Sequence, residues 1–308
     1  MAAQEEQLRI AQDLNRLREK ARRAMLSSID GADITTAWLS GSLVEGLGNQ
    51  SSDVDIFVQV ESLSASLPAT RRDSDHYTYA FVDADTRYDI EFWPSITISN
   101  LAHKLDAARF DDPDWNGNHY LSYWESEFIH RIGIGLPLLD EAPFSQIRAQ
   151  FNFVQFSKYL FEHCLRLFDD AFDDAVGMLA DEQLPCAVLR CRDVVELSID
   201  ALLYASGVTN DKAKFRASKL RRLAEIYTEY QSYEELFWHF EAVLPKPESD
   251  QKSYAEGALR FAGDLIGALQ DRLILTQWRH IYEACDDQPR SASILSTSLL
   301  RQTATVRR

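Results

Sequence analysis

Two aspartates separated by one valine, Asp53 and Asp55, carry the clearest chemical signal in the sequence. They open the stretch "DVDIFVQV", in which polar and apolar residues alternate as in a half-buried strand. Residues two apart on a strand point the same way and lie about 7 Å apart, so both carboxylates can face one site. Neighbouring carboxylates are costly to bury unless a cation lies between them. The pair therefore predicts a Mg²⁺ site for phosphate chemistry.

A second strand-like stretch, "RYDIEFW", supplies a third carboxylate. Two magnesium ions about 3.5 to 4 Å apart can hold the attacking and leaving oxygens of a phosphoryl or nucleotidyl displacement, and they need another acidic ligand from a neighbouring strand. Asp89 and Glu91 both fit this requirement because they share one strand face. The sequence leaves open which of the two is used.

The residues Gly41 and Ser42 precede the aspartates and predict a phosphate-binding turn. Glycine allows a tight turn and lets a phosphate approach the backbone without meeting a Cβ. We expect a short helix over "SLVEGLG", residues 42–48, whose first N–H groups and positive dipole end would favour an anion. The Ser42 hydroxyl can also donate a hydrogen bond to a phosphate oxygen.

Three further features allow a functional and a plain structural interpretation. On a helix through "NDKAKFRASKLRR", Lys212, Arg216 and Lys219 share one face, which could bind pyrophosphate or simply be solvated. Trp93, on the strand face of Asp89 and Glu91, could stack on a substrate ring or belong to the core. An acidic loop could receive a cationic substrate or be a solvated turn; it contains Asp111, Asp112, Asp114 and Trp115.

The periodicity of apolar residues predicts an α+β protein, with a small mixed sheet followed by a helical bundle. Helical spacing covers residues 3–28, strand patterns cover 34–40, 53–60, 76–84 and 86–94, and helical patterns return at 99–110 and 118–133. From 144 to 285 the chain is almost wholly helical by pattern. We therefore expect a catalytic domain over 1–140, a helical domain over 141–285 and a disordered tail over 286–308.

The composition limits the classes of partner. Forty-eight acidic residues against 32 basic ones give a net charge of −16, so we expect no binding of extended nucleic acid. No apolar run is long enough to cross a bilayer, and the charged first residues have no apolar signal core. The four cysteines form no CxxC pair. We expect a cytoplasmic protein that does not contact a membrane.

The pattern of Gly41-Ser42, ten residues, then Asp53-Val-Asp55-Ile and a strand with Asp89 resembles the nucleotidyltransferase superfamily typified by DNA polymerase β. The short distance to the third carboxylate and the helical C-terminal half are similar to the small-molecule branch, the aminoglycoside nucleotidyltransferases. The motif-bearing part covers about residues 30–95.

This resemblance implies a role for each matching residue. Gly41 and Ser42 would bind a nucleoside triphosphate, and Asp53 and Asp55 would bind the metal ions. Asp89 would be the third metal ligand or the base that takes the proton of the acceptor hydroxyl, with Glu91 as the alternative. The implied reaction moves a nucleoside monophosphate, AMP from ATP in the first instance, to a hydroxyl of a small acceptor. It uses Mg²⁺, expected as two ions, and releases pyrophosphate.

Two other functions fit the same residues. One is a synthase of cyclic-oligonucleotide second messengers, which resembles this chain in its Gly-Ser and Asp-x-Asp motifs but usually places the third aspartate further along. The other is a non-catalytic nucleotide-binding regulatory module. Such modules are often shorter and commonly lack one of the carboxylates.

Overall fold

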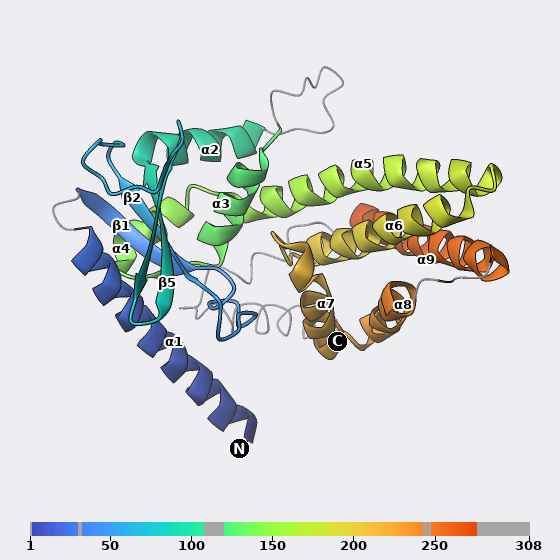
Figure 1. Cartoon of the computed structure of the whole chain (residues 1–308), viewed down its shortest axis with the longest axis horizontal. Coiled ribbons are helices and arrows are strands. Elements are labelled where there is room, and N and C mark those ends of the chain that lie inside the picture. The colour runs from blue at the N-terminus through green and yellow to red at the C-terminus, as the bar shows by residue number, and fades with distance from the viewer. Residues whose placement is uncertain (1, 30–32, 108–119, 243–244, 246–247, 276–308) are drawn as a thin grey trace. The chain divides into compact units, whose positions relative to one another are not determined.

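The chain folds into two compact units in a computed structural model that describes residues 2–29, 33–107, 120–242, 245 and 248–275 (Figure 1). The first unit ends at Asn152 and the second begins at Phe153. The first unit holds a mixed sheet and the second is helical, so the expected α+β class is confirmed. The expected tail over 286–308 lies outside the described residues.

The sheet of the first unit has six strands in the order β3-β4-β5-β2-β1-β6. Their bounds are β1 Ile34–Ser40, β2 Val54–Val60, β3 Arg71–Arg72, β4 Tyr77–Asp83, β5 Thr86–Pro94 and β6 Leu136–Pro137. β2 and β5 pair in parallel, and the other neighbours pair antiparallel. β4 and β5 form a hairpin whose turn residues Ala84 and Asp85 both have positive φ, as a tight hairpin turn requires.

The two faces of the sheet are covered differently. One face carries the valines and isoleucines of β2 and β5 and packs against α1, Ala2–Ser28, through residues such as Ala21 and Met25. The other face carries Trp38 and Phe57, whose rings stack at 5.7 Å between centroids. Phe128 of α3 packs edge-on against both rings. Burial of apolar groups on both faces makes β2 a rigid support for its polar residues.

Three helices complete the first unit: α2 Ser95–Ala107, α3 Tyr123–Gly133 and α4 Glu141–Arg148. Ser122 begins α3 as the N-cap of a full capping box with Glu125. α4 belongs to this unit because Phe144 packs against Trp38, with ring centroids 5.6 Å apart. The division between the units therefore lies at 152/153, later than the boundary at 140 that the sequence suggested.

Two local expectations are corrected. Residues 42–48 form no helix but a series of turns, in which Leu47 and Gly48 both donate to the Ser42 carbonyl at 2.8 and 2.9 Å. Gly46 takes a φ of 64°, which a helix does not allow. β2 begins at Val54, so Asp53 lies just before the strand.

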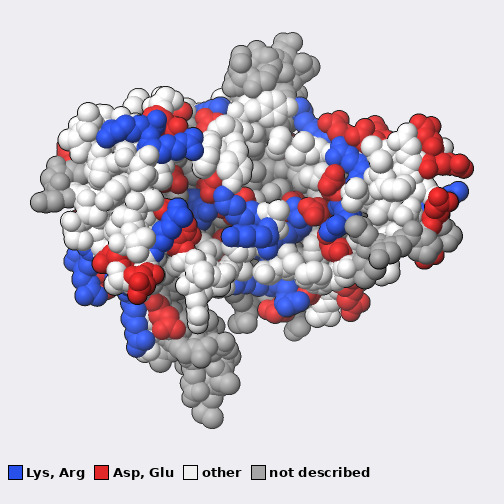
Figure 2. Space-filling model, viewed as in Figure 1, with Lys and Arg blue, Asp and Glu red and all other residues white. Residues whose placement is uncertain are grey.

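The second unit is built on three long helices, which Figure 1 shows side by side. The bounds in this unit are α5 Phe153–Ala180, α6 Leu184–Ala205, η2 Ala213–Phe215, α7 Arg216–Ile226, η3 Thr228–Tyr230, α8 Gln231–Ala242 and α9 Glu248–Leu275. Their shared core is rich in alanine, leucine and phenylalanine. The second half of α5 carries four exposed acidic residues, Asp169, Asp170, Asp173 and Asp174. Figure 2 shows acidic side chains gathered at the right of the view. In the described residues, no helix is long and apolar enough to span a membrane.

Candidate active site

The parallel pairing of β2 with β5 brings the strand-borne acids together. Asp55 is the direct neighbour of Asp89, and Phe57 is the direct neighbour of Glu91. Neighbouring strands lie about 4.8 Å apart, so in-register side chains on one face are adjacent. Asp53 lies two residues before Asp55 and interacts with Asp89. The four carboxylates predicted from the sequence thus lie on one face of the sheet, on or just before its two central strands, and all four are half-buried.

Gly41 contacts this carboxylate group directly. It follows the last residue of β1, where Ser40 pairs with Asp55, and its φ is 89°. A Cβ at Gly41 would overlap Asp55 Oδ2 and come within 2.8 Å of Arg131 Nη1. The position therefore requires glycine for its backbone conformation and for the close approach of the aspartate.

The turn after Gly41 offers backbone donors, although it is not a helix. In the part of the chain that the structure describes, the amides of Ser42 and Leu43 donate no backbone hydrogen bond. Successive free N–H groups in a turn form a concavity that suits an anion. Ser42 itself is half-buried. A phosphate could therefore bind to the backbone amides of this turn, although there is no helix dipole to attract it.

α3 supplies two charged residues that the sequence analysis did not select. The Arg131 guanidinium lies 3.7 Å from Asp55 Oδ2 and 3.1 Å from Glu127 Oε1. Arg131 is buried, and its carbonyl accepts a hydrogen bond of 2.8 Å from the Ser40 hydroxyl. These residues are far from the motif in sequence, and only the spacing of four between Glu127 and Arg131 hinted at an ion pair.

The crowding of acids perturbs their protonation. Burial raises the pKa of Asp55 to about 7 against the lowering effect of Arg131, and the charges of Asp53 and Asp89 raise it further. Burial also raises the pKa of Asp89, although two hydrogen bonds from Arg87 at 3.0 and 2.9 Å oppose this. A bound cation would relieve both the desolvation and the mutual repulsion.

Glu91 lies further along β5 in a different setting. Burial raises the pKa of Glu91 to about 7, while a hydrogen bond from the Trp93 indole opposes that shift. The indole Nε1 donates to Glu91 Oε2 at 2.9 Å and fixes the direction of the carboxylate. A group with a pKa near neutrality is well suited to accept a proton at physiological pH.

The donor set fits a hard divalent cation. Asp53, Asp55 and Asp89 offer only oxygen atoms, which Mg²⁺ prefers. In the described residues their ligand atoms do not all lie within 4.8 Å of one another. Arg87 binds both oxygens of Asp89, and Arg131 lies beside Asp55. A cation held by all three would therefore compete with the exposed Arg87 for Asp89.

The expected pyrophosphate face of the basic cluster is not present in the helical unit. Lys212 precedes η2, so it does not share a helix with the other two residues. Arg216 is buried and forms ion pairs with Asp200 at 2.8 Å and Glu196 at 2.7 Å. Lys219 is buried and donates to the Thr209 carbonyl at 2.8 Å. Arg216 and Lys219 thus use their charges inside the unit.

The acidic loop containing Asp111, Asp112, Asp114 and Trp115 lies outside the described residues. Trp93 is buried, and its ring stacks on His76 with centroids 4.6 Å apart. Its indole nitrogen nevertheless donates a hydrogen bond to Glu91, so Trp93 is both a core residue and a contact of the candidate site.

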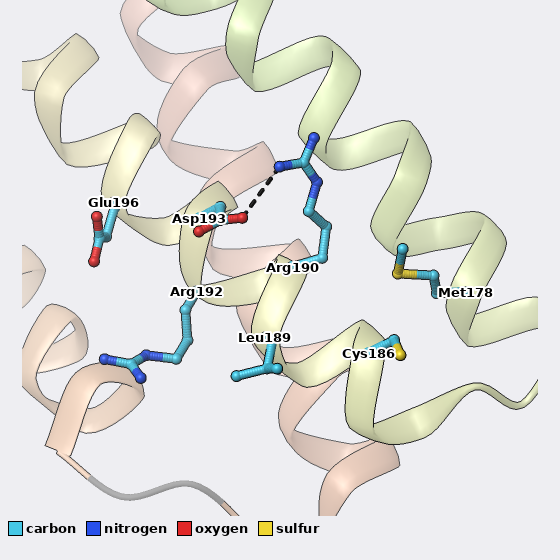
Figure 3. Close-up of a pocket in the computed structure, with 7 residues that line it drawn as sticks. All are labelled: Met178, Cys186, Leu189, Arg190, Arg192, Asp193 and Glu196. Carbon is cyan, nitrogen blue, oxygen red and sulfur yellow. Dashed lines mark hydrogen bonds and ion pairs between the residues drawn. The ribbon is translucent and has the colours of Figure 1, made fainter.

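The helical unit also has a surface pocket of about 450 Å³ (Figure 3). Its two arginines already have acidic partners: Arg190 bonds Asp193 at 3.1 Å and Asp174 at 3.0 Å, and Arg192 bonds Glu241 at 2.7 Å. It contains no residue of the predicted site. The carboxylate face of the first unit is therefore the stronger candidate.

Comparisons with known proteins leave the family open. No protein-family model matches the chain, and no curated protein matches it. Among solved structures, it is similar to a nucleotidyltransferase-like protein from Exiguobacterium sibiricum 255-15, with 11% identity and a TM-score of 0.43. The match covers 93% of this chain and 87% of that chain. Because a likeness this distant does not identify a family, the chemistry has to be inferred from the site residues.

Proposed function

We propose that the protein is a metal-dependent nucleotidyltransferase that moves a nucleoside monophosphate to a hydroxyl of a small acceptor and releases pyrophosphate. The observation that carries the proposal is the in-register pair Asp55 and Asp89, with Asp53 beside it and Gly41 packed against Asp55. ATP is the first nucleotide to test, as the resemblance to small-molecule nucleotidyltransferases suggests.

The chain's own groups divide into three tasks. The Ser42 and Leu43 amides would bind the phosphate tail of the nucleotide. Asp53, Asp55 and Asp89 would hold Mg²⁺, which neutralises phosphate charge and favours attack at the α-phosphorus. Arg131 would keep Asp55 in place from α3.

Glu91 is the better placed general base. Asp89 is bound by Arg87 and lies beside Asp55, which suits a metal ligand, whereas Glu91 has a pKa of about 7 and an orienting hydrogen bond from Trp93. Glu91 would take the proton of the acceptor hydroxyl. The acceptor oxygen then bonds to the α-phosphorus, and the bond from that phosphorus to the bridging oxygen breaks, so pyrophosphate leaves with its electron pair.

The test is release of pyrophosphate from each nucleoside triphosphate with Mg²⁺, with and without pooled small hydroxyl compounds. We expect acceptor-dependent release by the wild type and at least a hundredfold loss in Asp53→Asn/Asp55→Asn, because electrostatic stabilisation of the transition state by a bound metal contributes a factor of about 10² or more. Asp169→Asn/Asp170→Asn is the matched control, since it makes the same charge change on the exposed face of α5.

Three other outcomes would contradict the proposal. Pyrophosphate release from nucleotides alone, with an oligonucleotide product, would indicate a second-messenger synthase. Tight metal-dependent nucleotide binding without any release would indicate a regulatory module. Equal activity of the wild type and Asp53→Asn/Asp55→Asn would remove the carboxylate face from the reaction altogether.

A further inference from the structure

A pocket of about 610 Å³ lies in the first unit beside the carboxylate face. Its lining comes from the segment between β3 and β4, the end of β5, and helices α2 and α3, and it includes His76, Trp93 and Trp124. Cavities of about 300 to 1,000 Å³ are typical for small-molecule ligands. The proposed reaction assigns no role to the pocket except through Trp93.

The pocket is built from flat rings. His76 and Trp93 are buried and stacked, with ring centroids 4.6 Å apart and planes 5° apart. Trp124 is 45% exposed and lies 6.0 Å from the His76 ring, with Arg71 at 5.6 Å over its face. Because Trp124 is half-exposed while His76 and Trp93 are buried, Trp124 is the ring of the three that a planar ligand can contact most directly.

Among the charged residues that line the pocket, one acidic residue has no ion pair in the described residues. Arg71 pairs with Asp73 at 2.8 Å, and Lys104 pairs with Glu125 at 2.7 Å. Burial lowers the pKa of His76, which disfavours the charged form of its ring. Asp75 is exposed and has no ion pair among the described residues. The pocket therefore favours a ligand with an ammonium or another hydrogen-bond donor.

The pocket lies on the Glu91 side of the site. Trp93 lines the pocket and donates its indole hydrogen bond to Glu91, which is not itself a lining residue, so this carboxylate lies directly behind the pocket wall. Gly41 follows β1, which is two strands away from β5 in the sheet order. Two strand spacings amount to about 10 Å, which separates the phosphate turn from the pocket.

We propose that this pocket is the acceptor subsite, and that it takes a flat aromatic ring carrying an ammonium group and the hydroxyl that receives the nucleotide. The assignment as acceptor subsite rests on the proposed nucleotidyltransferase function. The aromatic preference does not, because it follows from the His76, Trp93 and Trp124 rings alone.

The preference for an aromatic ring can be tested with two matched probes. Their binding to the full chain is measured by ligand-observed NMR in the absence of nucleotide. Phenylethanolamine carries the ring, the ammonium and the hydroxyl, and its cyclohexyl analogue has the same groups on a saturated ring. We expect the phenyl probe to bind at least threefold more tightly, and Trp124→Leu to weaken it about fivefold, as the loss of one aromatic contact does. Trp238→Leu on α8 is the control, because Trp238 is similarly exposed at 44%.

Two further measurements distinguish ring binding in this pocket from the proposed transfer reaction. Asp53→Asn/Asp55→Asn should leave phenyl-probe binding unchanged, and Trp124→Leu should leave nucleotide binding unchanged while raising the KM for the phenyl probe as acceptor. Equal binding of both probes, or equal binding by the wild type and Trp124→Leu, would overturn the aromatic pocket. Ring binding by a wild type that releases no pyrophosphate would overturn only its role as acceptor subsite.

Discussion

Gly41 is the residue at which backbone conformation and carboxylate placement depend on each other. Its φ of 89° lies in the region that only glycine adopts without strain, and Asp55 Oδ2 occupies the space of a Cβ. We expect Gly41→Ala to lower the free energy of unfolding by about 1–3 kcal/mol and to abolish nucleotide transfer. Urea denaturation and the pyrophosphate assay measure the two effects.

Gly177→Ala is the control for this prediction. Gly177 lies in α5, and a Cβ there meets nothing within 4 Å. Alanine is better than glycine in a helix interior by about 0.5–1 kcal/mol, so this variant should be slightly stabilised and fully active. If Gly41→Ala behaves like Gly177→Ala, the close approach of Gly41 and Asp55 is not important for the fold or the site.

At this scale, the sequence predicted the types and directions of the motif residues but not their partners. Alternation placed Asp53 and Asp55 on one side, and the strand pattern placed Asp89 and Glu91 together. Arg131 could not be found in this way, because its approach to Asp55 depends on how α3 packs on the sheet. Long-range contacts of this kind leave no local pattern in a single sequence.

At the scale of elements, the segment 212–222 shows why charge periodicity alone misleads. Its spacing suggested a basic helix face, but Arg216 is the first residue of α7 and bonds Asp200 of α6 through two hydrogen bonds of 2.9 and 2.8 Å. Equal spacing along the sequence cannot distinguish a solvated arginine from one that neutralises buried acids. The prediction of a helix over 42–48 was wrong for a separate reason: Gly46 has a φ of 64°, which a helix does not allow.

Removing the Arg216 guanidinium should destabilise the helical unit. Arg216→Leu would leave the buried Asp200 without its charge partner, and breaking a buried pair in this way costs about 3–5 kcal/mol. Lys214→Leu is the control in the same segment, because Lys214 is exposed. Denaturant titration compares the two. Unchanged stability of Arg216→Leu with weaker nucleotide binding would instead support the phosphate-binding role that the sequence suggested.

At the scale of the whole chain, the fold class and element order could be predicted because long periodic segments dominate them. The alternating strands and the helical second half both appear in the structure. The first unit extends to Asn152 and includes α4, whose Phe144 packs on Trp38. The aromatic pocket could not be predicted, because its rings come from separate elements and meet only in the folded first unit.

The central claim is that Asp53, Asp55 and Asp89 form a divalent-metal site for a nucleotide, and calorimetric titration of Mn²⁺ tests it most directly. Metal binding must displace protons from carboxyl groups that are protonated at the start. Because the pKa of Asp55 is raised to about 7, binding should release protons at pH 6 and hardly any at pH 8, with higher affinity at pH 8. Titrations in two buffers of different ionisation enthalpy count these protons.

We predict Mn²⁺ binding that a nucleoside triphosphate strengthens, with proton release at pH 6 that disappears in Asp53→Asn/Asp55→Asn. Asp169→Asn/Asp170→Asn should behave like the wild type. Binding of Mn²⁺ that is the same in the wild type and Asp53→Asn/Asp55→Asn, or no binding at either pH with nucleotide present, would contradict the account.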